Sequence, residues 1–138
     1  LSDELAKGAL GALDRAGATY ERVAVPGALE IPAAIQIAVK SMEIRATARR
    51  RYDGYVALGC VIRGETSHYD TVAGESARGL MALALRHSLA IGNGILTCET
   101  HDQAWARAQV KAGDKGGFAA RACLTMVALR RRLLQPAG

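Results

Sequence analysis

Residues 55–70, YVALGCVIRGETSHYD, constrain the fold of this chain more than any other stretch. An apolar run rich in Val and Ile ends abruptly there in a polar, Gly-flanked turn. Such a run predicts a buried strand, and the residues after it predict the start of a helix. In an open α/β sheet, ligands bind at the turn that leaves the carboxyl end of a strand. We therefore expect a functional site at this turn.

Predicted strands and helices alternate along the rest of the chain. Strands are expected at residues 19–25, 54–62 and 90–97, and helices at 1–16, 32–42, 69–85, 101–112 and 117–132. This alternation predicts a parallel sheet with helices on both faces, a three-layer α/β/α sandwich. Since the chain opens on a helix and three strands make a thin sheet, we expect that a first strand is missing from it. Glycines in the last strand, Gly92 and Gly94, predict that another backbone or a ligand approaches closely.

Length and composition indicate one domain, residues 1–138, because half of the residues are hydrophobic. No run approaches the roughly 18 apolar residues of a membrane span, and the start LSDELAKGAL does not resemble a signal peptide. The cytoplasm is the expected location. Three isolated cysteines, Cys60, Cys98 and Cys123, lack the spacing of a metal site and argue against a disulfide framework.

The net charge of +5 does not predict a nucleic-acid interface. The basic residues gather at residues 45–51 and 130–132, and few aromatic residues lie between them to stack on bases. Residues 43–51 predict a helix end or a surface loop.

His68 lies at the predicted helix start beside Gly64, Thr66 and Ser67. Unpaired backbone N–H groups and the helix dipole favour anions at such a position. The same field disfavours a second positive charge, so a neutral imidazole that can accept a proton is expected near pH 7. The alternative is a surface histidine that caps the turn. Asp70 either orients this ring or stabilises the first helical turn, and the second interpretation is favoured.

Two further groups allow a structural and a functional interpretation. Glu30, at a helix entrance, either favours the helix start or accepts hydrogen bonds from ligand hydroxyls. Gln103, Arg107 and Lys111 share one helix face, with Lys115 in the next turn. This stripe is either solvated surface or part of a phosphate clamp.

Other conspicuous side chains favour structural interpretations. Arg63 follows an apolar strand and is expected to be a buried ion-pair partner. Trp105 and Phe118 are expected in the core or at a subunit contact. His87 and His101 have no second metal ligand at a useful spacing and are assigned no role.

Four segments, taken in order, resemble the lumazine synthase family, also known as the riboflavin synthase beta-chain family. They are VPGALEIP (residues 25–32), ALGCVIRGETSHYDTVAGES (57–76), GNGILTCETHDQAWARA (92–108) and KAGDKGGFAARA (111–122). The resemblance implies a flavodoxin-like subunit that assembles into pentamers and, in some members, icosahedral shells. It also implies the condensation of 5-amino-6-ribitylaminouracil with 3,4-dihydroxy-2-butanone 4-phosphate to 6,7-dimethyl-8-ribityllumazine, without a cofactor or metal.

The resemblance assigns roles by position. His68 would transfer protons, and Arg107 of the neighbouring subunit would hold the phosphate together with the backbone at the helix start. Glu30 would accept hydrogen bonds from the ribityl chain. The remaining residues implied in substrate binding are Ala28, Leu29, Ala57, Leu58, Gly59, Cys60, Val61, Gly64, Glu65, Thr66, Asn93 and Lys115.

The chain departs from the family pattern around the pyrimidine. The aromatic residue that stacks on that ring in other members follows the first strand, a region not present here. Leu29 stands where many members have Phe, and Asn93 stands where some have an aromatic residue. Two other functions stay open at this point: a lumazine or flavin binder without catalysis, and a basic nucleic-acid-binding module.

Overall fold

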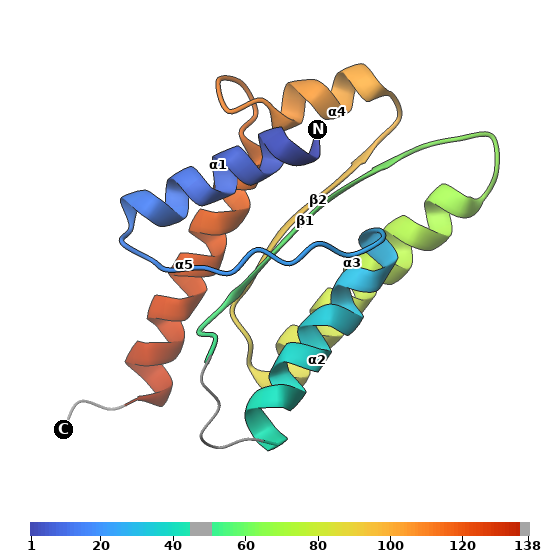
Figure 1. The fold of residues 1–138 in the computed structure, drawn as a ribbon. Helices are drawn as coiled ribbons and strands as arrows, with labels where there is room; N and C mark the ends of the chain where they lie inside the picture. Colours follow the sequence, from blue (N-terminus) through green and yellow to red (C-terminus); the bar gives the residue numbers. More distant parts are fainter. Residues whose placement is uncertain (45–50, 136–138) are drawn as a thin grey trace.

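Two parallel strands lie at the centre of the fold, β1 (Tyr55–Ile62) and β2 (Ile91–Cys98) (Figure 1). They pair in register from Tyr55 opposite Ile91 to Ile62 opposite Cys98. The computed structural model describes residues 1–44 and 51–135. Most of the basic connection predicted at residues 43–51 therefore lies outside the described residues.

Helices cover both faces of this sheet (Figure 1). On one face lie α1 (Ser2–Arg15), α4 (His101–Ala108) and α5 (Lys115–Leu134). On the other lie α2 (Ile31–Ile44), α3 (His68–His87) and a short 3₁₀ turn, η1 (Ala28–Glu30), which leads into α2. The predicted three-layer α/β/α sandwich with a parallel sheet is thus confirmed.

The side chains of β1 alternate between the two layers, as expected for a strand buried on both faces. Ala57 and Val61 pack with α2 and α3 in a core cluster that includes Ile35 and Leu80. Val56 and Leu58 instead pack on the side of α1 and α5. The strand predicted from its apolar run therefore contributes side chains to the core on both faces of the sheet.

Small residues bring α1, α5 and the sheet into backbone contact. A Cβ on Gly92 would lie 1.8 Å from the carbonyl oxygen of Ala119, and one on Gly116 would lie 2.0 Å from that of Leu5. The predicted close approach at Gly92 is confirmed, and the approaching group is the backbone of α5.

The strand predicted at residues 19–25 is wrong, since these residues form no strand in the structure. Thr19–Ala24 are all exposed, and within the described residues the sheet contains only β1 and β2. The β-rich composition of TYERVAV did not determine the outcome, because β propensity takes effect only where a strand has a pairing partner and a face to bury. Within the same described ranges, no helix has the length and hydropathy needed to cross a bilayer.

Candidate active site

A pocket of about 430 Å³ lies at the carboxyl end of β1. Three segments that are distant in sequence form it: the chain entering and forming η1, the end of β1, and the first turns of α3. Six of the residues predicted at the site line it together. They are Ala28, Leu29, Glu30, Cys60, Val61 and His68.

η1 determines where Glu30 lies. The Glu30 N–H donates to the Gly27 carbonyl at 3.1 Å, while the next residue, Ile31, is buried in the core. This turn leaves Glu30 exposed at the amino end of α2 and on the wall of the pocket. The position is compatible with both predicted roles, a helix-start charge and an acceptor for ligand hydroxyls.

His68 is the first residue of α3, one residue earlier than predicted. Its backbone N–H donates to Thr66 Oγ1 at 3.2 Å, and its exposed side chain lines the pocket. Gly64, Glu65 and Thr66 are exposed in the turn just before it. An exposed imidazole at a helix start can exchange protons with a ligand in the pocket.

Arg63 is an ion-pair partner as predicted, but it is exposed rather than buried. Its Nε lies 2.9 Å from Glu99 Oε2, and its Nη2 lies 3.4 Å from Asp70 Oδ1. The hydrogen bond to Glu99, followed by the charges of Glu99 and Asp70, raises the pKa of the guanidinium, and desolvation opposes this. Asp70 thus contacts Arg63, and its two predicted roles, orienting the ring or stabilising the first helical turn, stay predictions.

Three predicted residues of β1 do not line the pocket. Ala57 is buried in the core, Leu58 packs on the opposite face of the sheet, and a Cβ on Gly59 would contact Ile31 and Ala28 at ordinary distances. Of the three, Gly59 lies where η1 packs on the sheet.

Arg107 and Lys115 lie outside the pocket of their own chain. Arg107 is exposed on α4, where its Nη1 donates to Cys98 Sγ at 3.1 Å. Lys115 begins α5, and its Nζ lies 5.0 Å from the centre of the Phe118 ring. Phe118 and Trp105 are themselves exposed, so neither belongs to the core of its own chain, and the alternative of a subunit contact stays a prediction.

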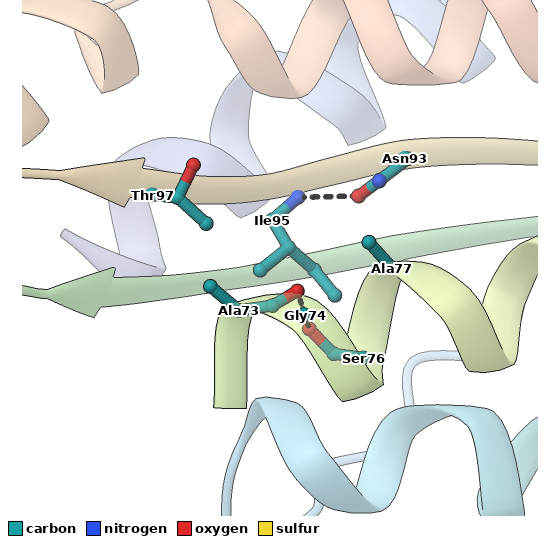
Figure 2. Close-up of a pocket in the computed structure, with 7 residues that line it drawn as sticks. All are labelled: Ala73, Gly74, Ser76, Ala77, Asn93, Ile95 and Thr97. Atoms are coloured by element: carbon teal, nitrogen blue, oxygen red, sulfur yellow. Dashed lines mark hydrogen bonds between the residues drawn. The ribbon is translucent and has the colours of Figure 1, made fainter. Parts of the chain in front are cut away.

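Asn93 lines a second hollow, of about 340 Å³, between β2 and α3 (Figure 2). Its Oδ1 accepts a hydrogen bond of 2.9 Å from the N–H of Ile95, as Figure 2 shows. Across the hollow, Ser76 Oγ donates to the carbonyl of Ala73 at 3.3 Å. The two hollows share no lining residue, so a single chain does not bring Asn93 to His68.

Four pocket residues were not predicted as site residues: Pro26, Gly27, Ile62 and Val72. Val72 follows His68 by one helical turn, so it shares the face of α3 that His68 presents. This spacing is a signal that the sequence offers. Among the described residues no group of three or more His, Cys, Asp or Glu side chains could hold a metal ion.

The cysteines should differ in reactivity. All three are free thiols, and Cys98 and Cys123 are buried while Cys60 is half-buried at the pocket. Burial, and secondarily the nearby Cys98, raises the pKa of the Cys60 thiol, so less thiolate exists at neutral pH. We expect iodoacetamide to modify Cys60 first, slowly at pH 7 and faster through pH 9 and above. Peptide mass mapping checks this, and equal labelling of all three thiols in the folded protein would contradict it.

A parallel sheet between helical layers, with a histidine and a carboxylate in one pocket at a strand's carboxyl end, defines a three-layer α/β/α subunit with a candidate small-molecule site. The family model of 6,7-dimethyl-8-ribityllumazine synthase matches residues 1–131. The chain belongs to this family.

Similar proteins bear the same name. The chain is 61% identical over 133 residues to 6,7-dimethyl-8-ribityllumazine synthase 1 of Rhizobium meliloti (strain 1021), covering 96% of this chain and 85% of that protein. It is 58% identical over 135 residues to the synthase of Azorhizobium caulinodans, covering 98% and 82%. The synthase of Agrobacterium fabrum is 57% identical over 133 residues, covering 96% and 88%.

Proposed function

We propose that the protein condenses 5-amino-6-ribitylaminouracil with 3,4-dihydroxy-2-butanone 4-phosphate to 6,7-dimethyl-8-ribityllumazine, phosphate and water. This is the penultimate step of riboflavin biosynthesis. Family membership supports the reaction. The structural observation that carries it is the meeting of Glu30 and His68, from separate elements, in one pocket.

His68 would be the proton-transfer residue. Imine formation, phosphate elimination and ring closure each move protons between nitrogen, carbon and oxygen. An exposed imidazole on the pocket wall can accept and return these protons without a cofactor. Binding both substrates in one pocket also makes their reaction effectively unimolecular, which lowers its free-energy barrier.

The remaining substrate contacts follow from the same proposal. The Glu30 carboxylate would accept hydrogen bonds from the ribityl hydroxyls, with Ala28 and Leu29 beside it. Ala57, Leu58, Gly59, Cys60 and Val61 would border the pyrimidine from β1, and Asn93 and Lys115 would approach it from another subunit.

The phosphate site would be shared between two subunits. Gly64, Glu65 and Thr66 lie in the exposed turn just before α3, and the start of that helix favours an anion. Arg107 lies outside this pocket in its own chain, so we propose that it reaches the pocket of a neighbouring copy. Exposed apolar side chains on α2 and α3 support such an assembly, a pentamer or a multiple of pentamers. They are Ile37, Ile44, Met81 and Leu85, each 60–75% exposed.

The proposal requires no cofactor or metal. We place the enzyme in the cytoplasm, because its three cysteines are free thiols and thiols persist in reducing compartments. Neither nucleic acid nor a membrane is a proposed partner.

A fluorescence assay tests the reaction directly. The two substrates should form the fluorescent lumazine faster with the protein than without it. Equal rates would contradict the proposal. Binding of the lumazine without faster formation would instead identify a binding protein on this fold.

Replacing Arg107 with alanine should weaken use of the phosphorylated ketone. Loss of a charge-assisted hydrogen bond to the phosphate should raise KM for that substrate about tenfold, with little change for the pyrimidine. Steady-state kinetics measure both values. Arg22→Ala is the control, because Arg22 is an exposed arginine paired only with Asp3 at 3.6 Å among the ion pairs of the described residues. A silent Arg107→Ala variant would refute the clamp.

Mixing two impaired variants, assayed at phosphorylated-ketone concentrations below KM where each alone is slow, tests whether Arg107 acts in a neighbouring site. When His68→Ala and Arg107→Ala chains are unfolded together and reassembled, some sites receive both His68 and a neighbour's Arg107. Random mixing at equal amounts should restore about one quarter of the wild-type sites. Reassembly of each variant alone is the control, and no recovery in the mixture would show that both residues act within one chain.

A further inference from the structure

Arg63 occupies the junction between the sheet and the turn that carries His68. It directly follows β1, and its backbone N–H donates to the carbonyl of Cys98 at 2.9 Å. This bond continues the β1–β2 ladder by one residue. The Cα of Arg63 is therefore fixed relative to the sheet, while residues 64–67 beyond it are exposed.

The Arg63 side chain reaches across this turn to the first turn of α3. Its Nη2 lies 3.4 Å from Asp70 Oδ1, and its guanidinium carbon lies 4.3 Å from the centre of the Tyr69 ring. Tyr69 and Asp70 directly follow His68 in the chain. Arg63 thus contacts the two residues next to the imidazole through a charge pair and a stacked ring.

The other partner of Arg63 is itself held in place. Arg63 Nε lies 2.9 Å from Glu99 Oε2, in the connection between β2 and α4. The backbone N–H of Glu99 donates to Gln103 Oε1 at 2.9 Å, and the Gln103 N–H donates to Thr100 Oγ1 at 3.2 Å. These bonds resemble a capping box and fix the start of α4. The backbone of Glu99 is therefore fixed at the start of α4, and its exposed carboxylate contacts Arg63.

Few other hydrogen bonds hold the start of α3, where Val72 and Tyr69 pack on the core cluster. Ser67, the N-cap residue, makes no side-chain capping bond, and the local bonds are His68 N–H to Thr66 Oγ1 and Thr71 N–H to the Ser67 carbonyl at 3.3 Å. Both bonds lie within the turn and the helix. The Arg63 contacts join this segment to the β2–α4 connection.

We propose that Arg63 is a positioning residue that holds His68 at the pocket by joining the first turn of α3 to Glu99. The inference rests on the role proposed for His68. Exposed ion pairs contribute little to the stability of a fold, whereas small displacements of a reacting group slow catalysis strongly. The role of Arg63 should therefore affect turnover and leave folding nearly unchanged.

Kinetics of four variants test the proposal. Arg63→Gln and Glu99→Gln should each lower kcat about tenfold while KM for both substrates stays within about twofold. The double variant should be no slower than Arg63→Gln alone, because the arginine substitution already removes the contact that Glu99→Gln breaks. Arg63→Lys keeps the charge but cannot contact Glu99, Asp70 and the Tyr69 ring together, so it should recover only part of kcat.

Arg131→Gln is the matched control. Arg131 pairs with Asp53 at 3.3 Å near the opposite end of β1, also at an exposed site, so its loss should leave kcat unchanged. Wild-type kcat in Arg63→Gln, or complete recovery in Arg63→Lys, would overturn the proposal while leaving the proposed reaction intact.

Hydrogen exchange separates the two proposals. Amides of residues 64–71 should exchange faster in Arg63→Gln than in Arg131→Gln, measured by mass spectrometry on the assembled protein. Absence of turnover in the wild-type protein would refute the proposed function. In that case hydrogen exchange alone tests whether Arg63 holds the start of α3. Faster exchange in Arg63→Gln than in Arg131→Gln supports this role, and equal exchange refutes it.

Discussion

Replacing His68 with alanine is expected to lower kcat about a hundredfold, because a positioned general acid and base contributes an effect of this order. KM for both substrates should change little, since the imidazole is one of several groups on the pocket wall. The fluorescence assay at saturating substrate measures the loss. Substrate affinity, measured separately by equilibrium binding, should stay near the wild-type value.

His101→Ala is the control for this variant. His101 is also exposed and also begins a helix, α4, but it does not line the pocket. The two variants remove the same side chain from comparable backbone positions. Similar kcat values for them would contradict a catalytic role for His68. Loss of substrate binding in His68→Ala alone would assign it to binding rather than to proton transfer.

Replacing Gly92 with alanine should cost about 3 kcal/mol or more in the free energy of unfolding. The new Cβ would lie 1.8 Å from the Ala119 carbonyl oxygen and 2.7 Å from the Ala119 carbonyl carbon. Both atoms belong to the backbone of α5, so no side-chain rotation relieves the overlap. Urea unfolding followed by circular dichroism measures the change, together with the yield of folded protein.

Gly11→Ala is the matched control for Gly92→Ala. Gly11 lies inside α1, and the nearest atom to its added Cβ is the flexible Arg15 guanidinium at 3.4 Å. Alanine is favoured over glycine in a helix interior by about 0.5–1 kcal/mol, so this variant should be at least as stable as the wild type. A Gly92→Ala protein that unfolds at the wild-type urea concentration would refute the backbone contact between β2 and α5.

The sequence was most informative where a local pattern and a buried environment agree. The apolar run of residues 54–62 and the polar turn after it predicted β1 and the start of α3 to within one residue. Residues 19–25 carry a similar β-rich pattern but form no strand, and residues 19–24 are exposed, because strand formation depends on a neighbouring strand rather than on the segment itself.

The helix predicted at residues 101–112 ends earlier, at Ala108. There the chain reverses, and the Gly113 N–H donates to the Ala106 carbonyl at 3.0 Å. A Cβ on Gly113 would lie 2.7 Å from the Arg107 Cα. Polar composition alone does not distinguish such a reversal from a further helical turn.

The sequence predicted which residues of the candidate site have suitable chemistry better than it predicted how the fold brings them together. The helix start at His68 and the helix entrance at Glu30 are visible as sequence patterns. These residues are brought together because η1 packs on β1. This packing depends on tertiary contacts, such as the close approach of Ile31 and Ala28 to Gly59. Residues that we propose come from another subunit cannot be placed by the pattern of one chain.

The two faces of the sheet differ in the amino-acid substitutions that they tolerate. On the α1 and α5 face, backbone atoms meet through Gly92 and Gly116, so even one added methyl group is excluded there. On the α2 and α3 face, aliphatic side chains such as Ile31 and Val72 fill the space, and the pocket opens among them. Such side chains can be exchanged for others of similar volume at modest cost. Substitutions that alter substrate range should therefore accumulate on the second face, while the first stays nearly invariant as a rigid support.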